Sequence, residues 1–210
     1  MVPDLFEYNS KSLIDLLSLN EHLSQYFSML REENKKINLV SRETIESGLE
    51  KLALESILPF EKIACCLFDN YLDIGSGGGF PSFPISIMKS IKSATLIERT
   101  GKKAAALKDF AKELNIESNI IEQNFDEIKF EIQFNLITMR LVKLSNGLLA
   151  KIMKLLKDDG IFVYYSFPAE NINSEKFSFR VFETRDLAIL KNDKLAQSKS
   201  FTLFANNRSV

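Results

Sequence analysis

Residues 71–84 read YLDIGSGGGFPSFP, and this stretch decides the fold of the chain. A short apolar strand ends in an acid, Asp73, and four glycines follow within residues 75–79. Glycine adopts backbone turns that other residues disfavour, and it lets a ligand approach the main chain closely. A strand, a tight glycine turn and a helix form the ligand-binding corner of a doubly wound α/β sheet. We therefore expect a nucleotide or cofactor beyond the end of this strand.

Short apolar runs alternate with helical periodicity on the C-terminal side of this corner. The pattern predicts strands at 71–74, 94–97, 119–122, 134–138 and 161–166, and helices at 83–91, 101–114 and 144–156. Such alternation is typical of βαβ units and a mainly parallel sheet. The tail segments KFSFRVFETRDL and SKSFTLFA have a period-two, aromatic-rich pattern instead. We expect them to form a closing antiparallel pair at the sheet edge.

The first sixty residues carry helical periodicity. Apolar residues recur at three- and four-residue spacing at Leu13, Leu16, Leu17, Leu23, Tyr26, Phe27 and Leu30. A further helix is predicted to begin at the capping-box pair Ser47 and Glu50 and to end near Pro59, with NKKINLVSR as a loop before it. The chain is thus divided into a helical extension, residues 1–62, and a main α/β domain, residues 63–210.

The composition limits the classes of protein to which this chain can belong. The chain has 210 residues, of which 45% are hydrophobic and 26% are charged, which suits one main globular domain. No membrane span or secretory signal is recognisable, so we expect a cytoplasmic protein. A single histidine, His22, and two adjacent cysteines, Cys65 and Cys66, argue against a metal site and a disulfide framework.

The net charge of −1 hides an uneven distribution. Residues 81–110 contain six basic residues, Lys89, Lys92, Arg99, Lys102, Lys103 and Lys108, and only two acidic ones. Six basic residues on two helices are by default a solvated face, but these adjoin the glycine loop and could attract phosphate groups.

The glycine spacing separates two classes of ligand. A dinucleotide fingerprint, G-x-G-x-x-G, requires a third glycine where this chain has Phe80. The observed D-x-G-x-G-x-G, with Asp73, Gly75, Gly77 and Gly79, is the first motif of S-adenosylmethionine (SAM)-dependent methyltransferases. An acid at the strand end suits the ammonium group of SAM. Glu98, at the end of the next strand, can accept both ribose hydroxyls, which suits NAD equally well.

Two later positions also follow predicted strands. Phe125 and Asp126 come after the third strand, where an adenine ring would lie, although a helix cap explains them about equally well. Arg140 follows the fourth strand, FNLIT, and is expected to face the cofactor pocket and the approaching substrate, with a surface salt bridge as the alternative.

Several segments resemble one family. The runs LDIGSGGGFPSFPISI, LIERTGKKAAAL, YFSMLREENKKINLVS and LALESILP are similar, in order over about residues 23–166, to bacterial small-subunit (16S) rRNA guanine-N7 methyltransferases (RsmG, or glucose-inhibited division protein B). The resemblance implies a Rossmann-like class I SAM-dependent methyltransferase with a helical N-terminal extension. It also implies that Gly75, Phe80, Phe125 and Asp126 touch SAM, and that Arg140 lies between SAM and RNA.

The chain departs from the family pattern mainly on the presumed RNA side. A histidine, an arginine and a lysine of that pattern are Leu52, Asn124 and Ser166 here. Three alternatives therefore stay open: a methyltransferase for another acceptor, a nicotinamide enzyme, and a non-catalytic ribosome-assembly factor with a degenerate site.

Methylation of guanine N7 makes few demands on acid or base groups. N7 carries an unprotonated lone pair, so the reaction needs placement and desolvation more than proton removal. We expect Arg140 to be the catalytic residue, holding O6 or a flanking phosphate. Candidates for phosphate contacts are Lys102 and Lys103, with Lys35, Lys36 and Arg42 in the N-terminal loop. The expected partner of this presumed monomer is 16S rRNA or the small ribosomal subunit, without metal or membrane.

Overall fold

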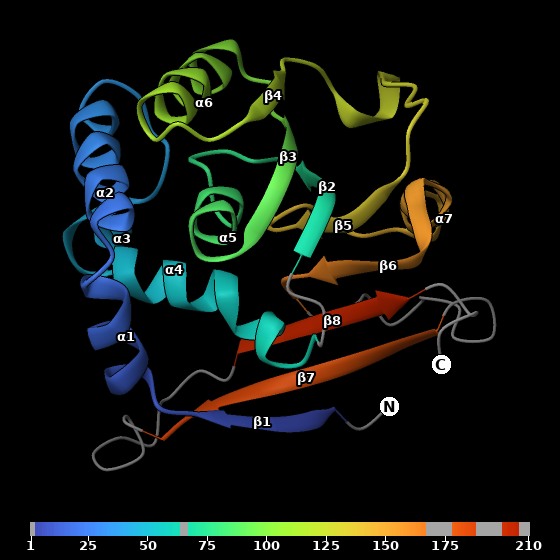
Figure 1. The fold of residues 1–210 in the computed structure, drawn as a ribbon, viewed down its shortest axis with the longest axis horizontal. Helices are drawn as coiled ribbons and strands as arrows, with labels where there is room; N and C mark the ends of the chain where they lie inside the picture. Colours follow the sequence, from blue (N-terminus) through green and yellow to red (C-terminus); the bar gives the residue numbers. More distant parts are fainter. Residues whose placement is uncertain (1–2, 64–66, 167–177, 188–198, 206–210) are drawn as a thin grey trace.

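The computed structural model of the chain describes residues 3–63, 67–166, 178–187 and 199–205, so Cys65 and Cys66 lie outside the described residues. Its centre is one eight-stranded sheet with the strand order β1-β7-β8-β6-β5-β2-β3-β4 (Figure 1). The strands are β1 (Asp4–Tyr8), β2 (Leu67–Ile74), β3 (Ser90–Ile97), β4 (Ser118–Ile121), β5 (Phe134–Met139), β6 (Leu156–Tyr164), β7 (Ser178–Asp186) and β8 (Lys199–Ala205).

The sheet is mainly parallel. Strand β2 pairs in parallel with both β3 and β5, and β3–β4 and β5–β6 are parallel as well. Strand β8 runs antiparallel to its two neighbours, β6 and β7. The expected α/β fold with an antiparallel closing pair is therefore confirmed. After β2 the chain forms β3 and β4 on one side of that strand, and β5 then pairs with its other side. The strand order therefore reverses between β2 and β5, which is the switch point where ligands bind in such sheets.

Seven helices accompany the sheet in the described part of the chain. They are α1 (Ser10–Ser18), α2 (Glu21–Asn34), α3 (Arg42–Ser47), α4 (Leu49–Ile57), α5 (Ser82–Met88), α6 (Gly101–Glu113) and α7 (Asn146–Leu155), with 3-10 turns at Leu58–Glu61 and Phe125–Glu127. None of these helices is long and apolar enough to cross a membrane.

Two apolar cores lie on opposite faces of the sheet. Neighbouring strand residues point to opposite faces, so Tyr71 joins one core and Leu72 the other. The first core is formed with α2, α4, α5 and α6, and the second with α7, which lies apart from the other helices in Figure 1. Burial on both faces explains why these strands read as continuous apolar runs rather than alternating ones.

The N-terminal extension shares the first core. Leu23 and Leu30 of α2 and Leu49 of α4 are fully buried in the same cluster as Phe83 of α5 and Leu107 of α6. A boundary at residue 62 stays a prediction, and the apolar packing is continuous across it.

The extension is not purely helical, which corrects the expectation from the sequence. Residues Asp4–Tyr8 form β1, which pairs in parallel with β7 at the sheet edge. Two exposed ion pairs, Asp4–Arg180 and Glu7–Arg185, join the same two strands. Five residues with one apolar–polar alternation give too little periodicity to identify a strand whose partner lies far along the chain.

Several helix boundaries also differ from the expected ones. The helix expected at 83–91 ends at Met88, because Ser90 and Ile91 belong to β3. Ser47 ends the unpredicted α3 and does not cap α4, whose N-cap is Gly48 without a side-chain hydrogen bond. Ser41 caps α3 instead, accepting a hydrogen bond from the Thr44 N–H. Helix α7 ends early because Leu156 is buried in β6 opposite Phe134, so strand pairing overrides the local helical pattern.

Candidate functional site

A cleft of about 720 Å³ opens at the carboxyl ends of β2, β3 and β5. The glycine loop, the ends of the neighbouring strands and residues after β4 and β5 form three of its walls. The N-terminal extension forms the fourth wall, with Leu39, Val40, Ser41, Thr44 and Leu52. This size suits a cofactor-sized ligand with room for an acceptor group.

The glycine loop is held in left-handed backbone conformations, with φ angles of 78° at Gly75, 56° at Gly77 and 97° at Gly79. Two consecutive N–H groups, of Gly75 and Ser76, donate to the Ile97 carbonyl at 2.9 Å. A Cβ on Gly77 would meet only the Gly75 carbonyl, at 3.9 Å, so the backbone faces open space there. The loop therefore presents main-chain surface to the cleft.

The far side of the loop is packed tightly against the N-terminal extension. A Cβ on Gly79 would lie 2.2 Å from the Phe83 ring and 2.9 Å from the Tyr26 hydroxyl. Tyr26 is fully buried on α2 and donates a hydrogen bond of 2.7 Å to the Gly78 carbonyl. Its ring also packs against Phe80 and Phe83, with centroids 5.3 and 5.2 Å apart. The extension thus fixes the shape of the loop.

Replacing Tyr26 with phenylalanine tests this anchor. The ring stays in its aromatic cluster, but the buried Gly78 carbonyl loses its donor, which costs about 1–2 kcal/mol. We expect the thermal midpoint to fall by roughly 3–6 °C in a chain of this size and the dissociation constant of SAM to rise a few-fold. Calorimetry measures both quantities. An unchanged midpoint and an unchanged affinity would remove Tyr26 from the construction of the loop.

Asp73 lies beneath the loop and does not line the cleft, so its contact with a ligand stays a prediction. It is fully buried, and its Oδ1 accepts a hydrogen bond of 2.6 Å from Thr138, whose hydroxyl is also 2.8 Å from that of Tyr71. Its Oδ2 is buried without a hydrogen-bond partner among the described residues. Burial raises the pKa of Asp73 to about 6, against the lowering effect of the Thr138 hydrogen bond. The charge of Asp73 can therefore act on a ligand in the cleft as a long-range electrostatic effect.

Glu98 lies on the cleft wall at the end of β3. Its Oε2 accepts from the Gly77 N–H at 2.9 Å and its Oε1 from the Thr100 N–H at 2.8 Å. Each carboxylate oxygen has two acceptor sites, so both oxygens keep capacity for a ligand hydroxyl. Glu98 therefore links the glycine loop to the predicted ribose position.

Phe125 and Asp126 separate in the structure. Phe125 is buried and lines the cleft, whereas Asp126 is exposed and does not. The Asn124 side chain accepts from the Asp126 N–H at 3.4 Å, so Asn124 and not Asp126 caps this turn. Lys151 of α7 holds the turn from outside, because its Nζ donates to the Phe125 carbonyl at 2.6 Å and lies 4.3 Å from the ring centroid.

Arg140 reaches the cleft but is engaged by the extension. Its Nη2 donates to Oε2 of Glu55, on α4, at 2.8 Å, and the two side chains are only 15% and 8% exposed. The second nitrogen, Nη1, is buried and has no hydrogen-bond partner among the described residues. The guanidinium group also lies 5.9 Å from the centroid of the Tyr165 ring. Arg140 also lines the cleft, and a guanidinium held in this way is suited to bind an acceptor atom there.

The basic residues of segment 81–110 do not lie together in the structure. Arg99 and Lys103 line the cleft, and the exposed Lys102 adjoins them on α6. Lys92 lies near the opposite end of β3 and pairs with Asp69 at 2.6 Å, so the basic residues of segment 81–110 do not form one surface. Within the described residues, Arg99, Lys102 and Lys103 form no ion pair.

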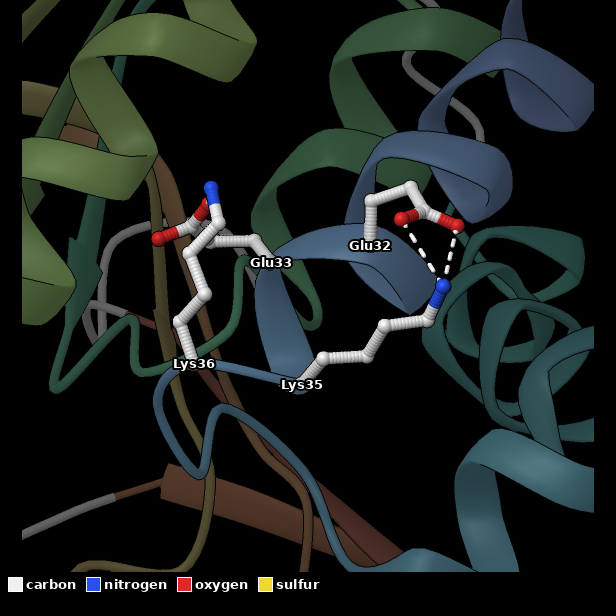
Figure 2. Close-up of polar contacts among 4 residues, drawn as sticks. All are labelled: Glu32, Glu33, Lys35 and Lys36. Atoms are coloured by element: carbon white, nitrogen blue, oxygen red, sulfur yellow. Dashed lines mark hydrogen bonds and ion pairs between the residues drawn. The ribbon is translucent and has the colours of Figure 1, made fainter.

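The basic residues of the N-terminal loop all have acidic neighbours. Figure 2 shows Lys35 beside Glu32 and Lys36 beside Glu33, and the shortest N–O distance is 2.7 Å in both pairs. Arg42 lies 3.9 Å from a carboxylate one helical turn away. Exposed pairs of this kind contribute at most about 1 kcal/mol, so a phosphate could replace the carboxylate, but the free cations of α6 are the stronger candidates.

Sequence reasoning did not identify three residues that build the site: Tyr26, Glu55 and Lys151. Each acts on a partner that is distant in sequence, and apolar periodicity alone explains Tyr26. The described residues contain no group of three or more His, Cys, Asp or Glu side chains arranged to hold a metal ion.

The chain matches the family described as rRNA small subunit methyltransferase G (GidB) over residues 19–199. A ribosomal RNA small subunit methyltransferase G of Mycoplasma mobile is 31% identical over 219 residues, covering 96% of this chain and 92% of that protein. The protein of the same name from Helicobacter pylori is 33% identical over 148 residues, covering 70% of this chain and 82% of that protein.

A solved structure shares the fold at low sequence identity. A T. thermophilus 16S rRNA N2 methyltransferase (RsmC), in complex with AdoMet and guanosine, aligns with a TM-score of 0.55 and 18% identity, over 80% of this chain and 44% of that one. The likeness agrees with the sheet order described above and shows a class I methyltransferase fold. With the family match over most of its length, the chain belongs to the rRNA small subunit methyltransferase G family.

Proposed function

We propose that this protein transfers a methyl group from SAM to N7 of a guanine in 16S rRNA. The observation that carries the proposal is that one cleft joins the glycine loop, Glu98 and the guanidinium of Arg140. The first two suit a cofactor, and the third supplies a fixed donor beside it. Family membership supports rRNA of the small subunit as the acceptor.

The residues of the cleft fit SAM. The backbone of Gly75 and Gly77 would contact its methionyl part, Glu98 its ribose hydroxyls and Phe125 its adenine ring, with Phe80 closing the apolar side of the wall. When bound, SAM supplies an electrophilic methyl group on a sulfonium. The buried carboxylate of Asp73 favours this cationic ligand electrostatically from beneath the loop.

The acceptor requires orientation and not deprotonation. Guanine N7 presents a free lone pair in the plane of the base, so the enzyme must direct that edge toward the methyl group and exclude water. Arg140 lines the cleft, and its guanidinium would donate to guanine O6, which leaves N7 free. Leu52, which stands where the family pattern has a histidine, also lines the cleft and adds an apolar surface.

Phosphate contacts would come from the cations at the cleft mouth. Arg99, Lys102 and Lys103 have no competing ion pair within the described residues, so they can neutralise RNA phosphates directly. Such contacts position the RNA without reading its sequence, and they weaken as salt concentration rises. We place this activity in the cytoplasm, on 16S rRNA or the small subunit, with the protein acting as a monomer.

The decisive experiment measures transfer of labelled methyl from SAM to small ribosomal subunits that lack the N7 mark. Label that maps to guanine N7 and falls steeply with added salt supports the proposal, and neutralising Lys102 and Lys103 together should reduce both the rate and the salt dependence. Cofactor affinity is measured in parallel by calorimetry. Binding of SAM without transfer to subunits or to naked 16S rRNA would contradict the proposal and favour a non-catalytic assembly factor or another acceptor.

A further inference from the structure

Leu141 stands out at the mouth of the cleft. It follows Arg140, lines the cleft, and is 96% exposed. Single exposed apolar residues are common on protein surfaces, so exposure alone does not indicate a role. Leu141, however, lies beside Arg140 on the lining of the cleft, where an acceptor base would bind.

The backbone of Leu141 is also strained. Its φ angle is 59°, in the left-handed region that most residues other than glycine disfavour. The other described non-glycine residue with positive φ is Asn115, which follows the C-terminus of α6, where asparagine tolerates this conformation. A leucine at such a position has no local reason of that kind, and strain of this type concentrates at binding sites.

The neighbours of Leu141 explain how the strain is maintained. Arg140 is held by Glu55, and Met139, the last residue of β5, is fully buried. On the other side, Val142 packs against Gly75, since a Cβ on that glycine would lie 3.0 Å from Val142 Cγ2. With both sides fixed, the chain at Leu141 must turn outward, and the side chain stands free at the cleft mouth.

We propose that Leu141 packs against the face of the acceptor base and is a positioning residue for the methyl acceptor. The inference rests on the proposed function. Arg140 would hold the edge of the purine while Leu141 covers its face, which together fix the plane in which N7 approaches the cofactor. The apolar side chain gains from this contact because it exchanges water for an aromatic surface. Its binding partner is thus an unstacked purine.

Three variants test the proposal on the full-length protein. Leu141→Asn keeps a residue that tolerates positive φ but removes the apolar surface, and Leu141→Met keeps the surface. The matched control is Leu19→Asn, at a leucine that is 80% exposed and does not line the cleft. We measure kcat and KM for small subunits, the dissociation constant of SAM, and the thermal midpoint.

Leu141→Asn is expected to raise KM for subunits about tenfold, with the SAM dissociation constant close to that of the wild type and a thermal midpoint that is equal or higher, because asparagine relieves the backbone strain. Leu141→Met should restore KM to within about threefold, and Leu19→Asn should have no effect. A wild-type KM in Leu141→Asn, or a rise in the SAM dissociation constant instead, would overturn the inference. Absence of transfer by the wild-type protein would overturn the proposed function itself, so the two failures are distinguishable.

Discussion

Replacing Arg140 with alanine is expected to lower methyl transfer to small subunits about 10²-fold or more, while the SAM dissociation constant changes less than about threefold. The guanidinium is the cleft's fixed cationic donor beside the cofactor loop, and its Nη1 has no hydrogen-bond partner among the described residues. Its loss removes a donor that orients the acceptor. Labelled-methyl transfer and calorimetry measure the two quantities on the same preparation.

The alanine variant also has an expected structural cost. Arg140 and Glu55 form a nearly buried ion pair at 2.8 Å, and removing one partner of such a pair typically destabilises a protein by about 3–5 kcal/mol. Loss of activity in Arg140→Ala alone would therefore not separate an acceptor contact from a damaged fold. A neutral pair is needed as the control.

The double variant Arg140→Gln/Glu55→Gln supplies that control. Two amides of similar length can hydrogen-bond to each other, so the free energy of unfolding should recover most of the loss seen in Arg140→Ala, while methyl transfer should stay about 10²-fold low. Glu55→Gln alone should keep measurable activity, because the guanidinium remains. Full turnover by the double variant would show that Arg140 serves the fold and not the acceptor.

Local patterns in the sequence predicted the approximate places of three parts of the candidate cofactor site. The glycine loop, Glu98 and Phe125 each follow an apolar strand, and parallel strands bring their carboxyl ends to one edge of the sheet. Their approximate places could thus be predicted from strand order alone. The structure places all three on the cleft wall, and their contacts with SAM stay predictions.

Contacts between the extension and the sheet could not be predicted in this way. Glu55 meets Arg140 across 85 positions of sequence, and Tyr26 meets Gly78 across 52. Strand β1 is defined by its partner β7, and its own five residues carry little signal. Asp73 was correctly predicted to lie at the end of a strand. Only the packing of the folded chain reveals that its carboxylate is directed below the loop.

Replacing Asp73 with asparagine is expected to change the pH dependence of stability. The pKa of this carboxyl rises from 3.8 to about 6 in the folded protein, chiefly because of burial. A raised pKa means that the native state binds the proton more tightly than the unfolded state, so the associated stability is fully present below pH 3.8 and lost as pH rises through 6. A shift of about two units corresponds to about 3 kcal/mol.

An asparagine does not titrate, so the free energy of unfolding of Asp73→Asn relative to wild type should rise by about 2.4 kcal/mol between pH 4 and pH 7. Urea unfolding at several pH values measures this difference, and any constant cost of the amide cancels from the slope. Asp69→Asn is the control on the same strand. Asp69 is exposed and its pKa is lowered by the hydrogen bond from Lys92, so its slope should have the opposite sign.

The same substitution should have opposite effects on stability and on SAM binding. Above pH 6 the wild-type carboxylate favours a cationic ligand, so Asp73→Asn should bind SAM about tenfold more weakly although its relative stability is highest there. Near pH 5 the wild-type group is mostly protonated, and the two affinities should converge. If the difference in unfolding free energy between Asp73→Asn and the wild type does not change with pH, then burial does not raise the pKa of this carboxyl. If the affinities are equal at pH 8, its charge does not reach the cofactor, and the acid at the end of β2 serves only to hold Thr138 and the loop above it.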